Sequence, residues 1–416
     1  MSYLPRCLDQ RLDQVLSALG GVIIEGSRAC GKTSTGLHHA KSSIRLDEPA
    51  SAKLAELDPA GVLAGEAPRL IDEWQLEPSI WNSMRHEIDA RQETGQFILS
   101  GSATPTDDVR RHSGAGRIGR IRMRPMTLAE SGESSRQVSL NELDNQEQLT
   151  GVRSQLSYRD LAKLAVRGGW PGLLGLSSEA ALDFVSSYCS DIAAVDLPLA
   201  VGVRHDPKGI ERLLISIARN ISSETNAAKL ARDMASDGHH VDAGTVRKYL
   251  DALERIFIFE EQYAWAASLR SRTRLRKQPK LHFVDPSIAC AALRINAERL
   301  ARDPEFFGQV FESMVVRDIR VYAEARRGTV YHYRDESGLE VDIIIELADG
   351  GWAGIEVKLG QSMVEQAEAN LIKLRDQRID TEKLGEPAFL AVVTGTEFGY
   401  TLPSNVHVVP LGALTA

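Results

Sequence analysis

The sequence has few cysteines and no long hydrophobic run. Its four cysteines, Cys7, Cys30, Cys189 and Cys290, lie far apart and form no C-x-x-C pair, which argues against a disulfide framework and a zinc knuckle. The first ten residues, MSYLPRCLDQ, lack a basic start followed by an apolar core, and no apolar run is long enough to cross a bilayer. We therefore expect a cytoplasmic protein without a membrane partner.

The sequence also lacks a strong excess of one charge. The formal net charge is -8 over 416 residues, which does not indicate nucleic-acid binding but leaves room for a local basic patch. Hydrophobic residues make up 43% and charged residues 25%, as in ordinary globular proteins. The length exceeds what one hydrophobic core usually supports, so two to four domains are expected.

A phosphate-binding motif follows the apolar run GVIIE. The stretch GSRACGKTS matches G-x-x-x-x-G-K-[ST], and a helix-forming run comes after it. Backbone N–H groups and the helix start would face the phosphates of a nucleotide. Lys32 would add a positive charge there, and the Thr33 hydroxyl would bind Mg²⁺. The candidate nucleotide-binding residues of this loop are Gly26, Ser27, Arg28, Ala29, Cys30, Gly31, Lys32, Thr33 and Ser34.

Two further apolar runs end in polar residues. In APRLIDEWQ, Asp72 and Glu73 stand at the end of an expected strand, where an aspartate would hold Mg²⁺ and a glutamate would polarise an attacking water. Two acids at a strand end can also simply begin a loop. In GQFILSGSA, Ser102 or Ser100 would contact the γ-phosphate, or would cap a helix near Thr106.

An arginine-rich segment, RRHSGAGRIGRIRMRP, comes next. A guanidinium group stabilises charge on a transferring phosphoryl group, so Arg117 or Arg120 is a candidate arginine finger, acting within or between subunits of a homo-oligomer. A solvated basic strand explains each arginine equally well when it is taken singly. Neither the finger nor the oligomeric state follows from the sequence.

Together, GSRACGKT, LIDEWQ, LSGSA and HSGAGRIGRIRMRPMTLAE resemble the prokaryotic AAA-type ATPases that are related to the archaeal ATPase and STAND groups. The resemblance extends over nearly the whole chain and implies an ATP-binding α/β domain. It favours ATP over GTP, and the absence of an N/TKxD tetrapeptide agrees. Ser27 stands where such loops often have proline.

The middle of the chain is predicted to be helical. Residues 131–148 are polar and predict a flexible excursion, and the LAVRGGWPGLLG segment resembles the turn of a small helical part packed on the ATPase. Asp191 and Asp196 are expected to be surface carboxylates.

Three helical runs between residues 210 and 261, followed by a β-prone run, fit a winged helix-turn-helix. Thr245, Arg247 and Lys248 would begin its recognition helix. The basic segment 270–280 would form a wing that contacts DNA phosphates, although such modules also bind proteins. The basic residues of this segment are Arg270, Arg272, Arg274, Arg276, Lys277 and Lys280.

The last part contains three strand-like runs, TVYHYR, LEVDIIIEL and GWAGIEVKLG. Strand side chains alternate, so Glu356 and Lys358 face the same way, and Asp342 joins them if the second and third strands are neighbours. Carboxylates of this kind suit Mg²⁺ or Mn²⁺, and the lysine would orient a water for phosphodiester attack.

This pattern resembles the PD-(D/E)XK nuclease superfamily. Asp342, Glu356 and Lys358 match its D…E-x-K signature, and Glu312 matches the acid on the preceding helix. The resemblance implies Glu312, Asp342 and Glu356 as metal ligands. An ordinary edge strand, or a fold that has lost its activity, remains the alternative.

The predicted fold class is α/β, with a P-loop parallel-sheet ATPase domain, a helical winged-helix middle and an α/β restriction-endonuclease-like C-terminal domain. The expected boundaries are 1–135 for the ATPase, 136–205 for a helical lid, 206–280 for the winged helix and 281–416 for the nuclease-like domain. The leading hypothesis is an ATP-hydrolysing switch that controls a DNA-directed, nuclease-like domain. The alternative is a regulatory or signalling ATPase whose C-terminal half binds a protein without cutting anything.

Overall fold

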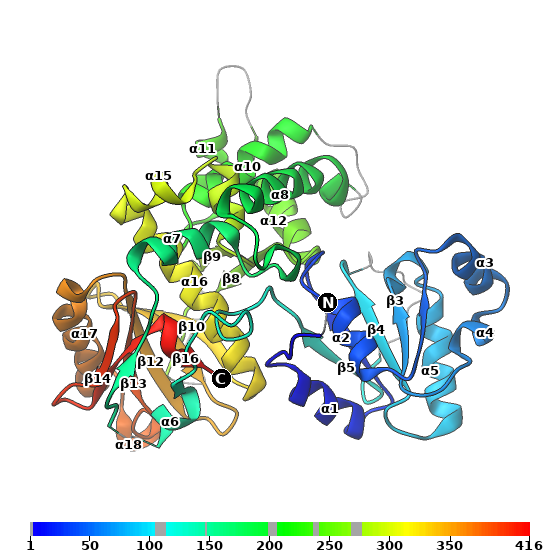
Figure 1. The fold of residues 1–416 in the computed structure, drawn as a ribbon, viewed down its shortest axis with the longest axis horizontal. Coiled ribbons are helices and arrows are strands. Elements are labelled where there is room, and N and C mark those ends of the chain that lie inside the picture. Colours follow the sequence, from blue (N-terminus) through cyan, green and yellow to red (C-terminus); the bar gives the residue numbers. More distant parts are fainter. Residues whose placement is uncertain (1–2, 105–113, 146–147, 199–205, 236–240, 268–276) are drawn as a thin grey trace.

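The computed structural model describes residues 3–104, 114–145, 148–198, 206–235, 241–267 and 277–416. Figure 1 shows an N-terminal α/β unit, a mostly helical region and a C-terminal sheet flanked by helices. None of the helices in these ranges combines the length and the apolar character needed to span a membrane.

The N-terminal unit is built on a five-stranded parallel sheet with the strand order β2-β3-β4-β1-β5. Side chains alternate across it, so Val22 and Ile24 pack in one core cluster while Ile23 packs in the other. The strands are β1 (Gly21–Glu25), β2 (Ser42–Arg45), β3 (Arg69–Asp72), β4 (Phe97–Gly101) and β5 (Ile118–Arg122). The helices are α1 (Asp9–Ala18), α2 (Lys32–His39), α3 (Pro49–Leu57), α4 (Pro59–Leu63), η1 (Trp74–Leu76) and α5 (Ile80–Arg91).

The helical region begins with α7, and a capping box formed by Ser157 and Asp160 stabilises the first turn of this helix. Its helices α7 to α12 are followed by a two-stranded antiparallel ribbon of β8 and β9, and two short helices complete the region. Its elements are α7 (Tyr158–Arg167), η2 (Pro171–Leu173), α8 (Ser178–Asp191), η3 (Ile192–Asp196), α10 (Pro207–Arg219), α11 (Ala227–Met234), α12 (Ala243–Arg255), β8 (Phe259–Gln262), β9 (Lys280–Phe283), α14 (Ser287–Ala292) and α15 (Ala297–Ala301).

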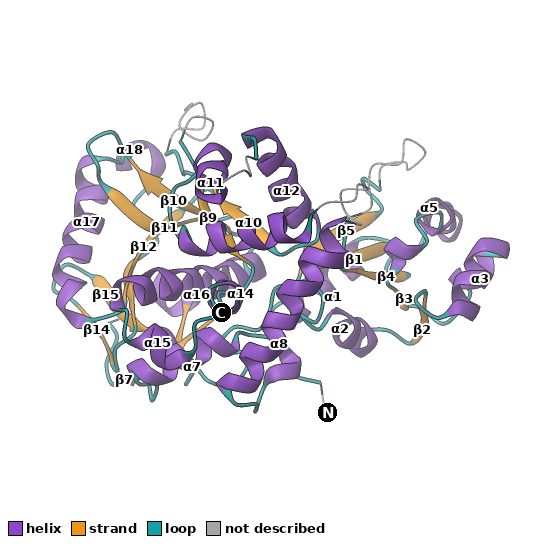
Figure 2. Cartoon of the chain, turned by 90° about the horizontal axis from the view of Figure 1, so that it is seen from above, coloured by secondary structure: helices purple, strands orange, loops and turns teal. Residues whose placement is uncertain are grey.

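The C-terminal region is a seven-stranded mixed sheet in the order β10-β11-β12-β13-β15-β14-β7, and Figure 2 shows α16 and α17 beside it. The three runs that the sequence predicted as strands are β10, β11 and β12. The elements are α16 (Pro304–Ala325), β10 (Thr329–Arg334), β11 (Glu340–Glu346), β12 (Trp352–Lys358), η4 (Gln361–Met363), α17 (Val364–Gln377), α18 (Thr381–Leu384), β13 (Leu390–Thr394), β14 (Phe398–Thr401), β15 (Val406–Pro410), η5 (Leu411–Ala413) and β16 (Leu414–Thr415).

One hydrophobic core joins the helical and C-terminal regions. The largest cluster of buried apolar residues extends from Leu128 to Leu414 and includes Leu213 of α10, Leu253 of α12 and Ile343 of β11. The N-terminal sheet packs in two separate clusters of its own. We therefore expect the helical and C-terminal regions to unfold together.

The described residues of the polar stretch 131–148 pack on the C-terminal region. There β6 (Val138–Ser139) pairs with β16 and α6 (Leu140–Asp144) follows, and just after the stretch β7 (Val152–Arg153) pairs with β14. The side chains of Val138 and Leu143 are buried. The prediction of a flexible excursion was wrong, because a few apolar residues anchor a segment that is polar in composition.

Glu260 of β8 joins all three regions through ion pairs. Its carboxylate accepts hydrogen bonds from Arg124 at 3.1 Å and from Arg320 of α16 at 2.7 Å, and it lies 3.4 Å from Arg122. Arg124 also pairs with Glu324 at 2.7 Å. Burial opposes the ionisation of Glu260, but the three guanidinium groups outweigh it and hold its pKa well below the ordinary value.

Replacing Glu260 with glutamine should destabilise the chain near neutral pH, because Arg124 and Arg320 lose a buried counter-ion; breaking such a pair costs about 3–5 kcal/mol. The folded pKa of Glu260 is depressed, so the ionised group contributes stability above its unfolded pKa of about 4.3. That contribution is lost as the pH falls from there through the folded pKa. The melting temperatures of the two proteins should therefore differ widely near neutral pH and converge in acid.

The matched control is Glu87→Gln. Glu87 forms an ion pair with Arg91 on the surface of α5, and such pairs contribute about 0–1 kcal/mol. A Glu260→Gln variant that melts with the control at neutral pH, or that keeps the same deficit in acid, would contradict this account of the ion-pair network.

Candidate functional site

The phosphate-binding loop connects β1 to α2. Gly26 follows β1, and a side chain there would place its Cβ atom 2.1 Å from the Met123 carbonyl oxygen. Gly31, which precedes α2, has φ 107°, a left-handed conformation that favours glycine. The loop thus leads into a helix N-terminus, where free N–H groups can bind phosphate.

Lys32 and Ser27 face each other across this loop. Lys32 is buried, and its Nζ donates to the Ser27 carbonyl oxygen at 2.8 Å. The Ser27 Oγ is also buried and finds no hydrogen-bond partner within the described part of the chain. A buried hydroxyl without a partner is costly, so this atom is consistent with a loop that receives a polar ligand.

Thr33 and Asp72 form the most informative contact of the site. The Thr33 Oγ1 lies 3.0 Å from each carboxylate oxygen of Asp72. Asp72 also accepts a hydrogen bond from Ser100, and Arg45 lies 3.9 Å away. A hydroxyl beside a carboxylate is a pair of hard oxygen donors, which suits Mg²⁺. The residues present therefore fit the expected magnesium ion, and Thr33 and Asp72 would hold it.

Glu73 lies directly beyond this contact, in a left-handed backbone conformation with φ 55°. Its carboxylate accepts hydrogen bonds from Gln75 and, at 3.3 Å, from Ser102. Ser102 follows β4, which lies between β1 and β3. It therefore lies between the phosphate loop and the acid pair, Asp72 and Glu73. Gln75, which also donates to Ser102 at 3.2 Å, was missed in the sequence because no motif marks it.

Of the two candidate finger arginines, Arg117 lies just before β5 and Arg120 lies at the middle of the strand. Arg117 precedes the strand and pairs with Asp89 of α5 at 2.5 Å. Because β1 and β5 are parallel, this is the end of the sheet opposite the loop. Arg120 pairs with Glu25, the last residue of β1 before the loop. The assignment of a finger stays a prediction.

The helical region contacts the phosphate loop through Asp196. Arg28 pairs with Asp196 at 2.6 Å, and the Tyr188 hydroxyl donates to the Arg28 carbonyl oxygen at 3.5 Å. Asp196 is buried, and burial raises its pKa although Arg28 opposes the shift. The prediction that Asp196 is a surface carboxylate was wrong, because the end of η3 packs against the loop.

A cavity of about 520 Å³ adjoins the loop. Its walls include Tyr3 and Leu4, Leu37 and His38 of α2, and Pro171 of η2. The Tyr3 and His38 rings are stacked, with centroids 4.1 Å apart. A planar nucleobase can stack on such a surface, so the site has room for a nucleoside beside the phosphate loop. No sequence motif indicated this cavity.

In the C-terminal sheet, β11 and β12 are neighbours, and Asp342, Glu356 and Lys358 come together. The Lys358 Nζ lies 2.6 Å from Glu356 and 3.3 Å from Asp342. Asn370 of α17 donates to the other Glu356 oxygen at 3.0 Å. Burial and the Asp342 charge raise the pKa of Glu356, whereas two lysines overcome burial and lower the pKa of Asp342.

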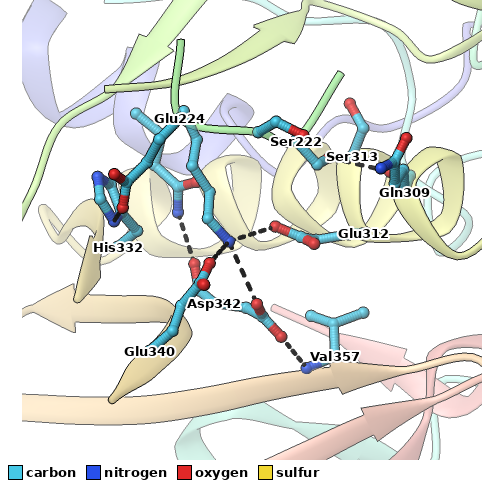
Figure 3. A network of polar contacts seen from close by, with 12 residues as sticks. Ser222, Glu224, Gln309, Glu312, Ser313, His332, Glu340, Asp342 and Val357 are labelled. Atoms are coloured by element: carbon cyan, nitrogen blue, oxygen red, sulfur yellow. Dashed lines mark hydrogen bonds and ion pairs between the residues drawn. The ribbon is translucent and has the colours of Figure 1, made fainter. Parts of the chain in front are cut away.

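Lys280 enters this cluster from β9. Its Nζ lies 2.7 Å from Glu340, 2.9 Å from Glu312 and 3.2 Å from Asp342, and Figure 3 shows these three carboxylates converging. Only 2% of the Lys280 side chain is exposed. The prediction that Lys280 belongs to a DNA-contacting segment was wrong, because its side chain is buried. Because Lys280 is the last residue of a basic run, the sequence did not indicate that it pairs with buried acids.

A divalent metal ion does not fit this arrangement. The oxygens of Glu312 and Asp342 surround an ammonium group at 2.9 and 3.2 Å, whereas Mg²⁺ requires ligands at about 2.0–2.1 Å. The third expected ligand, Glu356, is occupied by Lys358 and Asn370. Among the described residues, no three His, Cys, Asp or Glu side chains are grouped to hold a metal ion.

The expected recognition helix corresponds to α12. Lys248 is exposed, but Arg247 pairs with Glu261 at 3.0 Å, and the Thr245 hydroxyl donates to the helix cap Asp242 at 2.7 Å. Part of the expected basic wing lies outside the described residues, namely Arg270, Arg272, Arg274 and Arg276.

The sequence matches three protein-domain families. Residues 20–132 match an AAA domain, residues 158–299 a domain of unknown function, DUF8612, and residues 307–414 a second domain of unknown function, DUF4143. Uncharacterized proteins of Mycobacterium tuberculosis and Mycobacterium bovis are each 26% identical over 358 residues, which are 84% of this chain and 72% of theirs.

Two solved structures are similar at low identity. A Walker-type ATPase of Pyrococcus abyssi matches with 11% identity and a TM-score of 0.40 over 68% of this chain and 94% of that chain. The AMPPCP-bound DnaA of Aquifex aeolicus matches with 15% identity and a TM-score of 0.23 over 59% and 85%. The AAA-domain match contains the phosphate loop, the acid pair and both serines. Residues 20–132 therefore match an AAA domain and contain its phosphate-binding loop.

Proposed function

We propose that the protein is an ATP-hydrolysing switch whose N-terminal domain controls the C-terminal half. The observation that carries this proposal is the contact of Thr33 with both oxygens of Asp72 at 3.0 Å, which joins the phosphate loop to the acid pair. Mg²⁺ bound there would neutralise charge on the β- and γ-phosphates.

Each remaining residue has a role that its position supports. Lys32 and the loop amides bind the phosphates. Glu73, which Gln75 and Ser102 orient, accepts a proton from the attacking water. The cavity beside the stacked Tyr3–His38 pair takes the base. The resemblance of the loop and strand motifs to AAA-type ATPases favours ATP as the nucleotide.

Two polar contacts support communication with the rest of the chain. Arg28 of the loop pairs with Asp196, and Arg124, which follows β5, pairs with Glu260 of β8. The first contact involves the phosphate loop itself. The second is close to it, because β5 lies directly beside β1. A phosphate group would compete with Asp196 for Arg28, so nucleotide binding and this contact are linked.

For the helical region we propose contact with DNA. The order α10, α11, α12, β8, β9 is that of a winged helix-turn-helix, and Lys248 of α12 is exposed. The alternative partner is a protein, as in a regulatory or signalling ATPase.

Metal-dependent nuclease activity is the second candidate function of the C-terminal domain. The convergence of Asp342, Glu356 and Lys358 favours it, and the position of Lys280 opposes it. We therefore propose that the C-terminal domain shares the fold of PD-(D/E)XK proteins but does not cleave nucleic acid.

Replacing Glu73 with glutamine should lower ATP turnover by about 10²–10⁴-fold, because the proton acceptor is lost, while ATP binding is retained. Lys32→Ala should lose binding as well as turnover, because the charge that faces the phosphates is removed. Phosphate release and equilibrium binding of labelled ATP measure the two effects separately.

Glu56→Gln is the matched control, because Glu56 pairs with Lys53 on the exposed face of α3. This variant should turn over ATP at the wild-type rate. Normal turnover by Glu73→Gln would remove Glu73 from the mechanism, and normal turnover by Lys32→Ala would show that the nucleotide site is elsewhere.

Duplex DNA should bind the intact chain with an affinity that falls as salt rises. Lys248→Ala should weaken binding and reduce the slope of log affinity against log salt by about 1, as expected for one lost phosphate contact. Lys163→Ala, on the exposed face of α7, should change neither. Absence of binding even at low salt would favour the protein partner instead.

A further inference from the structure

The acidic cluster of the C-terminal region contains a buried lysine that the nuclease-like pattern does not include. Glu312, Glu340 and Asp342 belong to α16 and β11, whereas Lys280 belongs to β9 of the helical region. We propose that Lys280 is a tethered cation that takes the place of a divalent metal ion in this cluster. The cluster is then closed and metal-free, whatever nucleotide the N-terminal domain binds.

The geometry of the cluster is that of a complete ammonium site. A lysine has three N–H donors and no acceptor, and three carboxylates lie 2.7, 2.9 and 3.2 Å from the Lys280 Nζ. Every donor therefore has a carboxylate acceptor, and Figure 3 shows the carboxylates of Glu312, Glu340 and Asp342 around a single nitrogen atom. Drawing the same oxygens to about 2.0–2.1 Å, as Mg²⁺ requires, would displace this ammonium group.

Asp342 links the two halves of the cluster. One of its oxygens faces Lys280, and the other accepts hydrogen bonds from the Val357 backbone N–H at 2.9 Å and from Lys358 at 3.3 Å. Lys358 in turn binds Glu356. The two ammonium groups thus compensate the largely buried carboxylates of Glu312, Asp342 and Glu356 as well as the partly exposed Glu340, and removal of either one would take an ion-pair partner from a largely buried carboxylate.

The backbone around Lys280 is held as firmly as its side chain. Lys280 is paired with Gln262 in the β8–β9 ribbon. The Gln262 side chain donates to the carbonyl oxygens of Tyr331 and Asp342, both at 2.9 Å. The ribbon is therefore docked on β10 and β11 and holds Lys280 against the carboxylates.

The test is Lys280→Met in the intact, nucleotide-free chain, followed by thermal unfolding with and without Mn²⁺. The wild type should melt at the same temperature in both conditions. The variant should melt at a lower temperature, because Glu312, Glu340 and Asp342 lose the ammonium group that they share, and Mn²⁺ should raise its melting temperature by several degrees. Adding Asp342→Asn to the variant should abolish this rise.

Lys163→Met, which removes an exposed ammonium group, is the control and should show no response to Mn²⁺. A folded Lys280→Met protein that gains no response to the metal would overturn the proposal. If that variant does not fold, the test is Mn²⁺ binding to the wild type, measured by electron paramagnetic resonance. The proposal predicts no binding that depends on Asp342, and a wild-type Mn²⁺ site that Asp342→Asn removes would overturn it.

Discussion

The contact between Thr33 and Asp72 is the interaction on which the N-terminal site depends. These residues are 39 positions apart in the chain, and they meet because β1, β4 and β3 run parallel and side by side. Parallel strands bring their carboxyl ends to the same edge of a sheet, where ligands of α/β proteins bind. The phosphate loop, the acid pair and Ser102 therefore share one edge, and the chemistry of the site follows from this topology.

The β8–β9 ribbon connects this domain to the acidic cluster of the C-terminal region. On β8, Glu260 is held by Arg124 next to the N-terminal sheet, and Gln262, two residues later, is paired with Lys280. Residues two positions apart lie on the same face of a strand. Because the helical and C-terminal regions also share one core, a displacement of Glu260 would be transmitted to Lys280 through the paired strands of the ribbon.

The features that the sequence predicted are those that a local pattern specifies. The phosphate loop, the strands that end at Asp72 and Gly101, and the helix and three strands around Asp342 all depend on short runs of neighbouring residues. The missed features depend on segments that are remote in sequence. Asp196 meets the loop only after the helical region has folded, and Lys280 ends a basic run that suggested an exposed charge. Local composition does not reveal such partners.

The central claim is that Thr33 and Asp72 bind a metal ion together with the nucleotide. Titration of the intact chain with a non-hydrolysable ATP analogue, with and without Mg²⁺, tests it most directly when Asp72→Asn is measured alongside the wild type. The account predicts that Mg²⁺ tightens binding to the wild type and that Asp72→Asn loses this gain while it keeps the Mg²⁺-free affinity. Equal tightening by Mg²⁺ in both proteins would contradict it.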